Sequence, residues 1–159
     1  MNEMKENKHA YNKDVISQGK VMLTTEIDEL LDALVQEVQG IESIWLIGSR
    51  ANGTAKPESD WDFFIFGDCS VFEQIKSKPE LNLYNIDLLV VAGDGEFENP
   101  YASDKSGNLS DWSWQLKSLK TATYQSSKCE DFDPDGDGFV GGKTPFTTET
   151  LKAVRVRGT

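Results

Sequence analysis

The sequence is poor in cysteine and basic residues, and it has no long apolar run. Its two cysteines, Cys69 and Cys129, lie far apart and fit neither a disulfide framework nor the ligand spacing of a metal site. We therefore expect free thiols in a reducing compartment. The opening segment MNEMKENKHAYNKD is polar, and no apolar run reaches the length needed to span a bilayer. These absences predict a cytoplasmic protein with neither a signal peptide nor a membrane anchor.

Positive charge is also scarce. Lys and Arg number 16 against 27 Asp and Glu, which gives a formal net charge of −11. A negative field of this size repels a phosphate backbone unless a local basic patch overrides it, so nucleic acid is not an expected partner. With 159 residues, of which 38% are hydrophobic, the chain can bury one core and carry at most a small appendage.

The most regular pattern is a helix within LTTEIDELLDALVQEVQG. Either Thr24 or Thr25 can cap its first turn, and Gly40 follows its end. The apolar residues that recur at helical spacing are Ile27, Leu30, Leu31, Leu34, Val35 and Val38.

Short apolar runs predict three strands, at 43–47, at 61–66 and within 82–92. A helix after Ser70 is predicted between the second and third strands, with Pro79 closing its last turn. Because helices and strands alternate, we expect an α/β or α+β sheet covered by helices.

Beyond Gly93 the pattern changes. The segment GDGEFENPYASDKSGNLSD is rich in turn residues, which predicts a loop. Alternation around Trp112 and Trp114, followed by TATY, predicts a hairpin, and LKAVRVRG predicts a last strand. The two tryptophans are expected to pack in the core, with stacking on a base as the alternative. The chain is divided into a polar N-terminal tail (1–20), a core (21–95) and a β-rich C-terminal extension (96–159).

Two carboxylates stand at the start of the strand WDFFIF. Residues two apart in a strand point to the same face, so Asp60 and Asp62 lie side by side. They could be strand-entry residues in a solvated loop, but Asp87 heads the next apolar strand and can supply a third acid. Three clustered carboxylates repel one another unless a cation lies between them, and Mg²⁺ accepts such ligands. These residues predict a two-ion Mg²⁺ site.

A phosphate-binding turn is predicted after the strand SIWLI. Gly48 and Ser49 end this strand and open the short helical segment SRANG. Backbone N–H groups at a helix start, together with a hydroxyl, can receive phosphate, and glycine permits close approach. Arg50 and Lys56 are available to neutralise a triphosphate, although surface basic residues need no ligand.

Gly48-Ser49, ten intervening residues, Asp60-x-Asp62 and the later Asp87 resemble the signature of the DNA polymerase beta superfamily of nucleotidyltransferases. Within this superfamily, the sequence especially resembles the minimal nucleotidyltransferase branch. It implies a mixed sheet with flanking helices, ATP or another nucleoside triphosphate as substrate, and two Mg²⁺ ions. On this resemblance Asp60 and Asp62 hold the metals, Asp87 binds the catalytic metal and helps deprotonate the acceptor, and Gly48 and Ser49 hold the phosphates.

The implied reaction transfers a nucleoside monophosphate, with AMP favoured, to a hydroxyl group and releases pyrophosphate. The acidic balance favours a protein or a small molecule as the acceptor. The alternative is a catalytically silent, antitoxin-like module that binds a nucleotide or a partner.

One motif lies outside this scheme. In DPDGDGFV, Asp133, Asp135 and Asp137 followed by Gly138 reproduce the first half of a calcium loop. Position twelve of that loop is Thr144, where a bidentate Glu would be needed. A tight polar turn is the preferred interpretation, with calcium binding as the alternative.

Overall fold

The computed structural model describes residues 22–129 and 146–158. The predicted N-terminal tail and the DPDGDG motif lie outside the described residues. The helices are α2 (Thr25–Glu37), α3 (Ser49–Asn52) and α4 (Val71–Lys76), with 3-10 helices η1 (Pro79–Leu81) and η2 (Leu109–Trp112). The strands are β1 (Ile41–Ile47), β2 (Trp61–Gly67), β3 (Ile86–Val91), β4 (Glu96–Asn99), β5 (Ala102–Asn108), β6 (Gln115–Leu116), β7 (Thr121–Cys129) and β8 (Phe146–Gly158).

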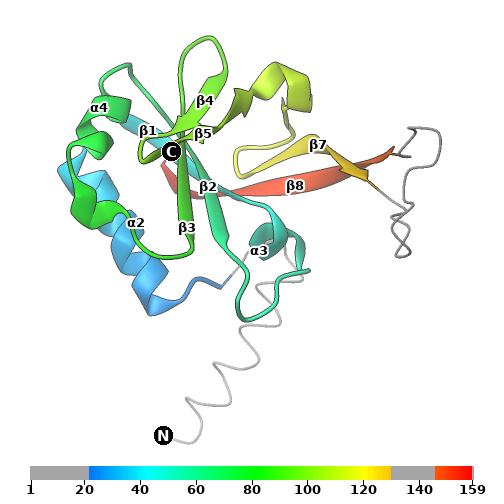
Figure 1. Cartoon of the computed structure of the whole chain (residues 1–159), viewed down its shortest axis with the longest axis horizontal. Helices are drawn as coiled ribbons and strands as arrows, with labels where there is room; N and C mark the ends of the chain where they lie inside the picture. The colour runs from blue at the N-terminus through cyan, green and yellow to red at the C-terminus, as the bar shows by residue number, and fades with distance from the viewer. Residues whose placement is uncertain (1–21, 130–145, 159) are drawn as a thin grey trace, which may run out of the picture.

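The strands of the described residues form one mixed sheet in the order β5-β4-β3-β2-β1-β8-β7-β6 (Figure 1). Strands β2 and β3 run parallel, and every other neighbouring pair is antiparallel. The α+β class with a mixed sheet and flanking helices is therefore confirmed. Strand β8 pairs with β1, so strands on both sides of the predicted boundary after residue 95 share one sheet. Within the described residues, no helix is both long and apolar enough to cross a membrane.

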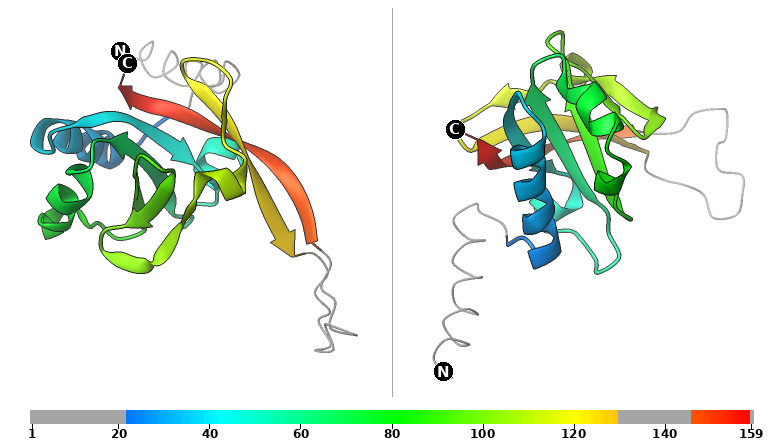
Figure 2. Two further views of the ribbon diagram at one scale, coloured as in Figure 1. Left: turned by 90° about the horizontal axis from the view of Figure 1, so that it is seen from above. Right: turned by 90° about the vertical axis from the view of Figure 1, so that its left-hand side faces the viewer.

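Each face of the sheet carries its own core. On one face, α2 and α4 lie together against the strands, and buried residues such as Leu31 and Ile75 pack with Phe63 and Ile65 (Figures 1 and 2). Apolar residues on the opposite side of the same strands, such as Phe64 and Leu89, form the second core.

Aromatic rings make up most of the second core. Phe64 lies 4.8 Å from Phe97 and 5.6 Å from Trp112 between ring centroids. Trp112 and Trp114 also stack on Tyr124, at 5.4 and 6.3 Å. The expectation that the two tryptophans pack in the core is confirmed. Their predicted place in a hairpin strand is wrong, because Trp112 ends η2 and Trp114 precedes β6. The hairpin itself forms, between β6 and β7.

The predicted helix forms α2. The hydroxyl of Thr24 caps it by accepting the backbone N–H of Ile27 at 3.2 Å. Leu34 is fully buried, whereas Val35, which belongs to the same apolar pattern, is 47% exposed. Successive helical residues are about 100° apart, and the sheet reaches only the side of α2 that carries Leu34.

The prediction of a loop after Gly93 is wrong, because this segment forms β4 and β5. Phe97 is buried against Phe64, whereas Glu96 on one side of it is exposed. This alternation is a strand signal, which the surrounding turn residues outweighed.

Neighbouring residues of α2 provide a test of this packing. Leu34→Ala should lower the free energy of unfolding by about 2–5 kcal/mol, because it leaves a cavity against the sheet. Val35→Ala, a matched truncation one residue away, should change it by less than about 0.5 kcal/mol. Urea denaturation followed by circular dichroism measures both. Equal losses would contradict the orientation of α2.

Candidate active site

The centre of the candidate site is a pair of carboxylates on neighbouring strands. Asp62 of β2 and Asp87 of β3 are direct partners in the parallel register. Both lie on the sheet face that carries Phe64 and Leu89 two residues further along each strand, so their carboxyl groups lie side by side at the edge of the aromatic core. Asp60 immediately precedes β2 and is exposed.

This arrangement changes the protonation of Asp62. Burial, followed by the charge of Asp87, a hydrogen bond with Asp87 and the charge of Asp60, raises the pKa of Asp62 from 3.8 to about 7, against a smaller opposing effect of Lys105. The apolar surroundings make a second negative charge beside Asp87 unfavourable. Asp62 can therefore hold a proton at pH values where an ordinary carboxyl group is ionised.

Gly48 passes close to this pair. Ile47 is the β1 partner of Asp62, and the next residue, Gly48, has a φ of +76°. A Cβ at this position would lie 2.9 Å from Oδ2 of Asp62, so only glycine leaves room for the carboxylate. The backbone N–H of Gly48 donates to the hydroxyl oxygen of Tyr124 at 2.8 Å. Burial raises the pKa of Tyr124, which keeps the phenol protonated.

The short helix α3 begins at Ser49, which is half-buried next to Gly48. Its last residue, Asn52, joins this turn to the C-terminal strand. The Asn52 amide donates to the carbonyl oxygens of Gly48 and Lys152 at 2.8 and 3.0 Å, and its oxygen accepts the N–H of Lys152 at 2.9 Å. The turn that carries Gly48 and Ser49 is therefore fixed to β8.

The two predicted basic residues lie differently. Arg50 donates to the carbonyl oxygens of Pro57 and Ser59 at 3.1 and 2.9 Å, and its guanidinium lies 4.6 Å from the ring centre of Trp61. These contacts hold the loop that leads to Asp60. Lys56 is exposed on the same loop.

Two residues that the sequence did not single out contact Asp87. The Lys105 ammonium donates to both carboxylate oxygens, at 2.9 and 3.0 Å, and the Asn99 amide approaches Oδ1 at 3.3 Å. Both residues lie in the segment that was predicted as a loop, so their position beside Asp87 was missed. The alternation around Phe97 was the available signal, because it places Asn99 on the same face.

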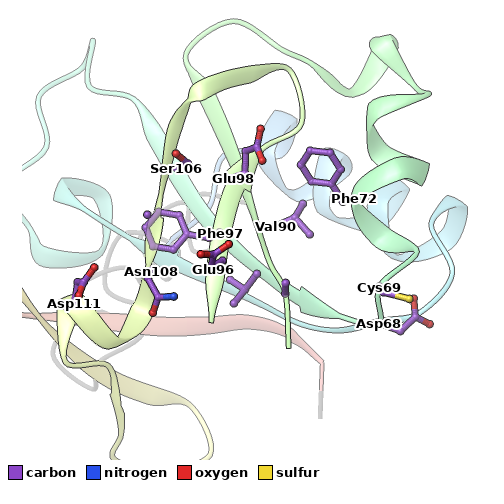
Figure 3. A pocket seen from close by; sticks show the side chains of 13 residues that line it. Asp68, Cys69, Phe72, Val90, Glu96, Phe97, Glu98, Ser106, Asn108 and Asp111 are labelled. Atoms are coloured by element: carbon purple, nitrogen blue, oxygen red, sulfur yellow. The ribbon is translucent and has the colours of Figure 1, made fainter. Parts of the chain in front are cut away.

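A cavity of about 400 Å³ opens beside this group, and its wall includes Asp60, Asp87, Asn99 and Lys105. A second cavity, of about 530 Å³, lies at the other ends of the strands (Figure 3). Its wall includes Val91, the last residue of β3, and the acidic side chains of Glu96 and Glu98. None of the predicted site residues lines it, so the first cavity is the one that belongs to the candidate site.

The carboxylates of the candidate site supply some of the ligands that a hard divalent cation needs. Asp62 and Asp87 offer adjacent carboxylate oxygens, the ligands that Mg²⁺ prefers, and the Lys105 ammonium shows that Asp87 already attracts a cation. Across residues 22–129 and 146–158, however, no three acidic, histidine or cysteine side chains are gathered closely enough to hold a metal ion. Asp60 acts on Asp62 through its charge.

Residues 27–130 match the nucleotidyltransferase domain family. The chain therefore belongs to this family, and the resemblance drawn from the sequence is confirmed. The match includes every predicted site residue. No curated protein and no solved structure gives a significant match. Family membership supports nucleotidyl transfer as the general activity and a nucleoside triphosphate as the substrate.

The raised pKa of Asp62 predicts a pH-dependent stability in metal-free buffer. Between about pH 4 and pH 7 the native state holds a proton that the unfolded state has lost, so native stability falls as pH rises through this window. Asp62→Asn removes this loss. Its melting temperature should exceed that of the wild type at pH 8 by on the order of 5 °C, with the difference shrinking towards pH 4. Thermal denaturation in EDTA measures it.

The exposed Asp111 provides the control, because Asp111→Asn removes the same charge far from the site. The difference in melting temperature between Asp111→Asn and the wild type should not grow from pH 4 to pH 8 as it does for Asp62→Asn. If Asp62→Asn changes the melting temperature by the same amount at pH 4 and at pH 8, the raised pKa of Asp62 is contradicted.

Gly48 and Gly53 have similar φ values, but they differ in ψ and in their contact with Asp62. At Gly53, with φ +75°, an added Cβ meets nothing within 4 Å, so Gly53→Ala should cost only the strain of a left-handed residue, about 1–2 kcal/mol. Gly48→Ala adds the contact with Asp62 and a backbone region that favours glycine, so it should cost about 1–3 kcal/mol more. Urea denaturation compares them, and equal costs would argue against this packing.

Proposed function

We propose that the chain is a Mg²⁺-dependent nucleotidyltransferase that transfers AMP from ATP, or another nucleoside monophosphate from its triphosphate, to a hydroxyl group of a protein or small molecule. The observation that carries this proposal is the pairing of Asp62 with Asp87 on parallel strands, directly beside the Gly48 turn. Family membership supports the general reaction. The residues around the pair support the finer assignment.

Asp60, Asp62 and Asp87 are the residues that would hold Mg²⁺. Bound there, Mg²⁺ would neutralise the triphosphate and the charge that develops on the reacting oxygens. The desolvated Asp62 and Asp87 pair is unfavourable as two bare negative charges, which favours the binding of a cation.

Asp87 is assigned the role of proton acceptor. The acceptor hydroxyl oxygen forms a bond to the α-phosphorus, and the bond from that phosphorus to the oxygen bridging the α- and β-phosphates breaks. The electron pair leaves with pyrophosphate, and the hydroxyl proton passes to Asp87. Asp87 suits this role because it lines the cavity of about 400 Å³, where an acceptor can approach.

The opposite side of β2 is assigned to the nucleotide. Gly48 and Ser49 follow β1, and Asp87 lies in β3. Strand β2, which carries Asp62, lies between these two strands. They would contact the phosphates, with Lys56 able to reach them from its exposed loop. Arg50, the fourth predicted nucleotide-binding residue, would act by holding the loop that positions Asp60.

The net charge of −11 favours a protein or small-molecule acceptor over nucleic acid. A catalytically silent nucleotide-binding module is the second candidate function. One observation favours it, since the ammonium of Lys105 pairs with both oxygens of Asp87, the carboxylate needed only for chemistry.

Asp87→Asn distinguishes the two functions. If Asp87 acts in the transfer step, the variant should bind Mg²⁺ and α,β-methylene-ATP within a few-fold of the wild type, because that interaction depends mainly on Asp62 and the Gly48 turn. Its transfer activity should fall by on the order of 10² or more. Calorimetry measures binding, and radiolabel from each of the four α-³²P nucleoside triphosphates, incubated with native lysate, measures transfer.

The control is Asp111→Asn, which should match the wild type in both assays. Analogue binding without any transfer by the wild type would select the silent module. Full transfer by Asp87→Asn would remove Asp87 from the reaction, and binding that persists in EDTA would contradict the metal dependence.

A further inference from the structure

Both oxygens of Asp87 are engaged by neighbouring side chains. The Lys105 ammonium donates to Oδ1 at 2.9 Å and to Oδ2 at 3.0 Å, and the Asn99 amide lies 3.3 Å from Oδ1. A divalent cation that binds Asp87 therefore has to approach oxygens that the Lys105 ammonium already contacts. An ammonium group and a divalent cation that bind the same carboxylate repel each other, so each weakens the binding of the other.

We propose that Lys105 is a built-in competitor for the metal, a positioning residue whose ammonium holds Asp87 until a divalent cation displaces it. Lys105 thereby weakens the binding of metal to the nucleotide-free protein. This inference rests on the proposed function in one respect, that a divalent cation binds Asp87. No part of it depends on transfer taking place.

Strand β5 carries Lys105 on the face of the sheet that carries Asp87. Gly107 is the β5 partner of Phe97 and lies against its ring, and Lys105, two residues earlier in β5, points to the same side. The consecutive β4 residues Glu98 and Asn99 pair with Ser106 and Ala102, so residues 103–105 of β5 have no partner of their own in β4. Strand β4 lies between β5 and β3, and the side chain of Lys105 reaches past β4 to Asp87.

Lys105 has room to leave. Its side chain is 47% exposed, whereas that of Asp87 is only 20% exposed. Lys105 also lines the cavity of about 400 Å³, so its ammonium can swing into solvent when Asp87 binds another cation. An ion pair with one exposed partner is weak enough to be exchanged.

Asp87 stays in place when Lys105 leaves. Asn99 is buried, with 4% exposure, and its side-chain oxygen accepts the backbone N–H of Tyr101 at 2.8 Å. Its amide group is thus fixed and continues to orient Asp87 through Oδ1. Oδ2 then becomes available to a metal ion. The lysine is exchangeable, and the asparagine is fixed.

The test is the affinity of the nucleotide-free protein for Mn²⁺, measured by calorimetry and by the electron paramagnetic resonance signal of free Mn²⁺. Lys105→Met keeps the length of the side chain and removes its charge, so it should bind Mn²⁺ about three- to tenfold more tightly than the wild type. Lys105→Arg restores a cation at the same position and should behave like the wild type.

Lys120→Met is the matched control, because it removes one exposed positive charge from the turn before β7. It should leave the affinity for Mn²⁺ unchanged, which separates local competition from a change in net charge. A second charge-removing variant, Lys105→Gln, should repeat the effect of Lys105→Met. Circular dichroism checks that each variant is folded.

The labelling of lysines in the unaltered protein gives an independent readout. Acetic anhydride should modify Lys105 faster when Mn²⁺ is present, because the freed amine is no longer held by Asp87, while Lys120 reacts at the same rate. Peptide mass spectrometry measures both rates.

An affinity of Lys105→Met for Mn²⁺ equal to or below that of the wild type would overturn the proposal, as would tighter binding by Lys105→Arg. No detectable Mn²⁺ binding by any variant would overturn it too. These outcomes are distinct from failure of the proposed function, because a wild type that gives no transfer can still show competition between Lys105 and Mn²⁺.

Discussion

The parallel pairing of β2 with β3 is the constraint on which the rest of the site depends. It sets Asp62 directly opposite Asp87, at the edge of an aromatic core that excludes water. Two carboxylates in such a place are unfavourable, and the surrounding residues compensate in different ways. The raised pKa of Asp62 favours its protonated form, Lys105 pairs with Asp87, and Gly48 supplies space instead of a side chain.

The same burial that destabilises the metal-free pair favours the binding of a cation. A carboxylate pair in open solvent would need no partner, and its charges would be screened. Here the rings of Phe64 and its aromatic neighbours limit solvation on one side, so added positive charge near Asp62 and Asp87 is strongly favoured. The repulsion between Asp62 and Asp87 therefore lowers the stability of the fold, and a bound cation would remove this repulsion. Such unfavourable charge pairs are common in active sites.

The C-terminal strands contribute to the site as well as to the sheet. Tyr124 of β7 accepts the backbone N–H of Gly48, and Asn52 bridges the Gly48 turn to Lys152 of β8. At the other end of β8, Arg157 pairs with Asp28 and Asp32 of α2 at 2.6 and 3.0 Å. The family match ends at residue 130, yet β8 lies beyond it and completes the support of the turn that carries Gly48 and Ser49. This chain therefore fixes its candidate nucleotide-binding turn with residues outside the matched region.

The sequence by itself determined the local elements and the acidic motif. Helical spacing specified α2, short apolar runs specified β1 to β3, and the positions of Asp60, Asp62 and Asp87 at strand starts followed from the chain alone, because these signals are carried by residues close together in sequence. Lys105, Asn99 and Tyr124 carry no such signal, since their partners are 18, 12 and 76 residues away. Only the order and register of the strands bring them to Asp87 and Gly48. Strand register is a tertiary property, and it decided which charges meet.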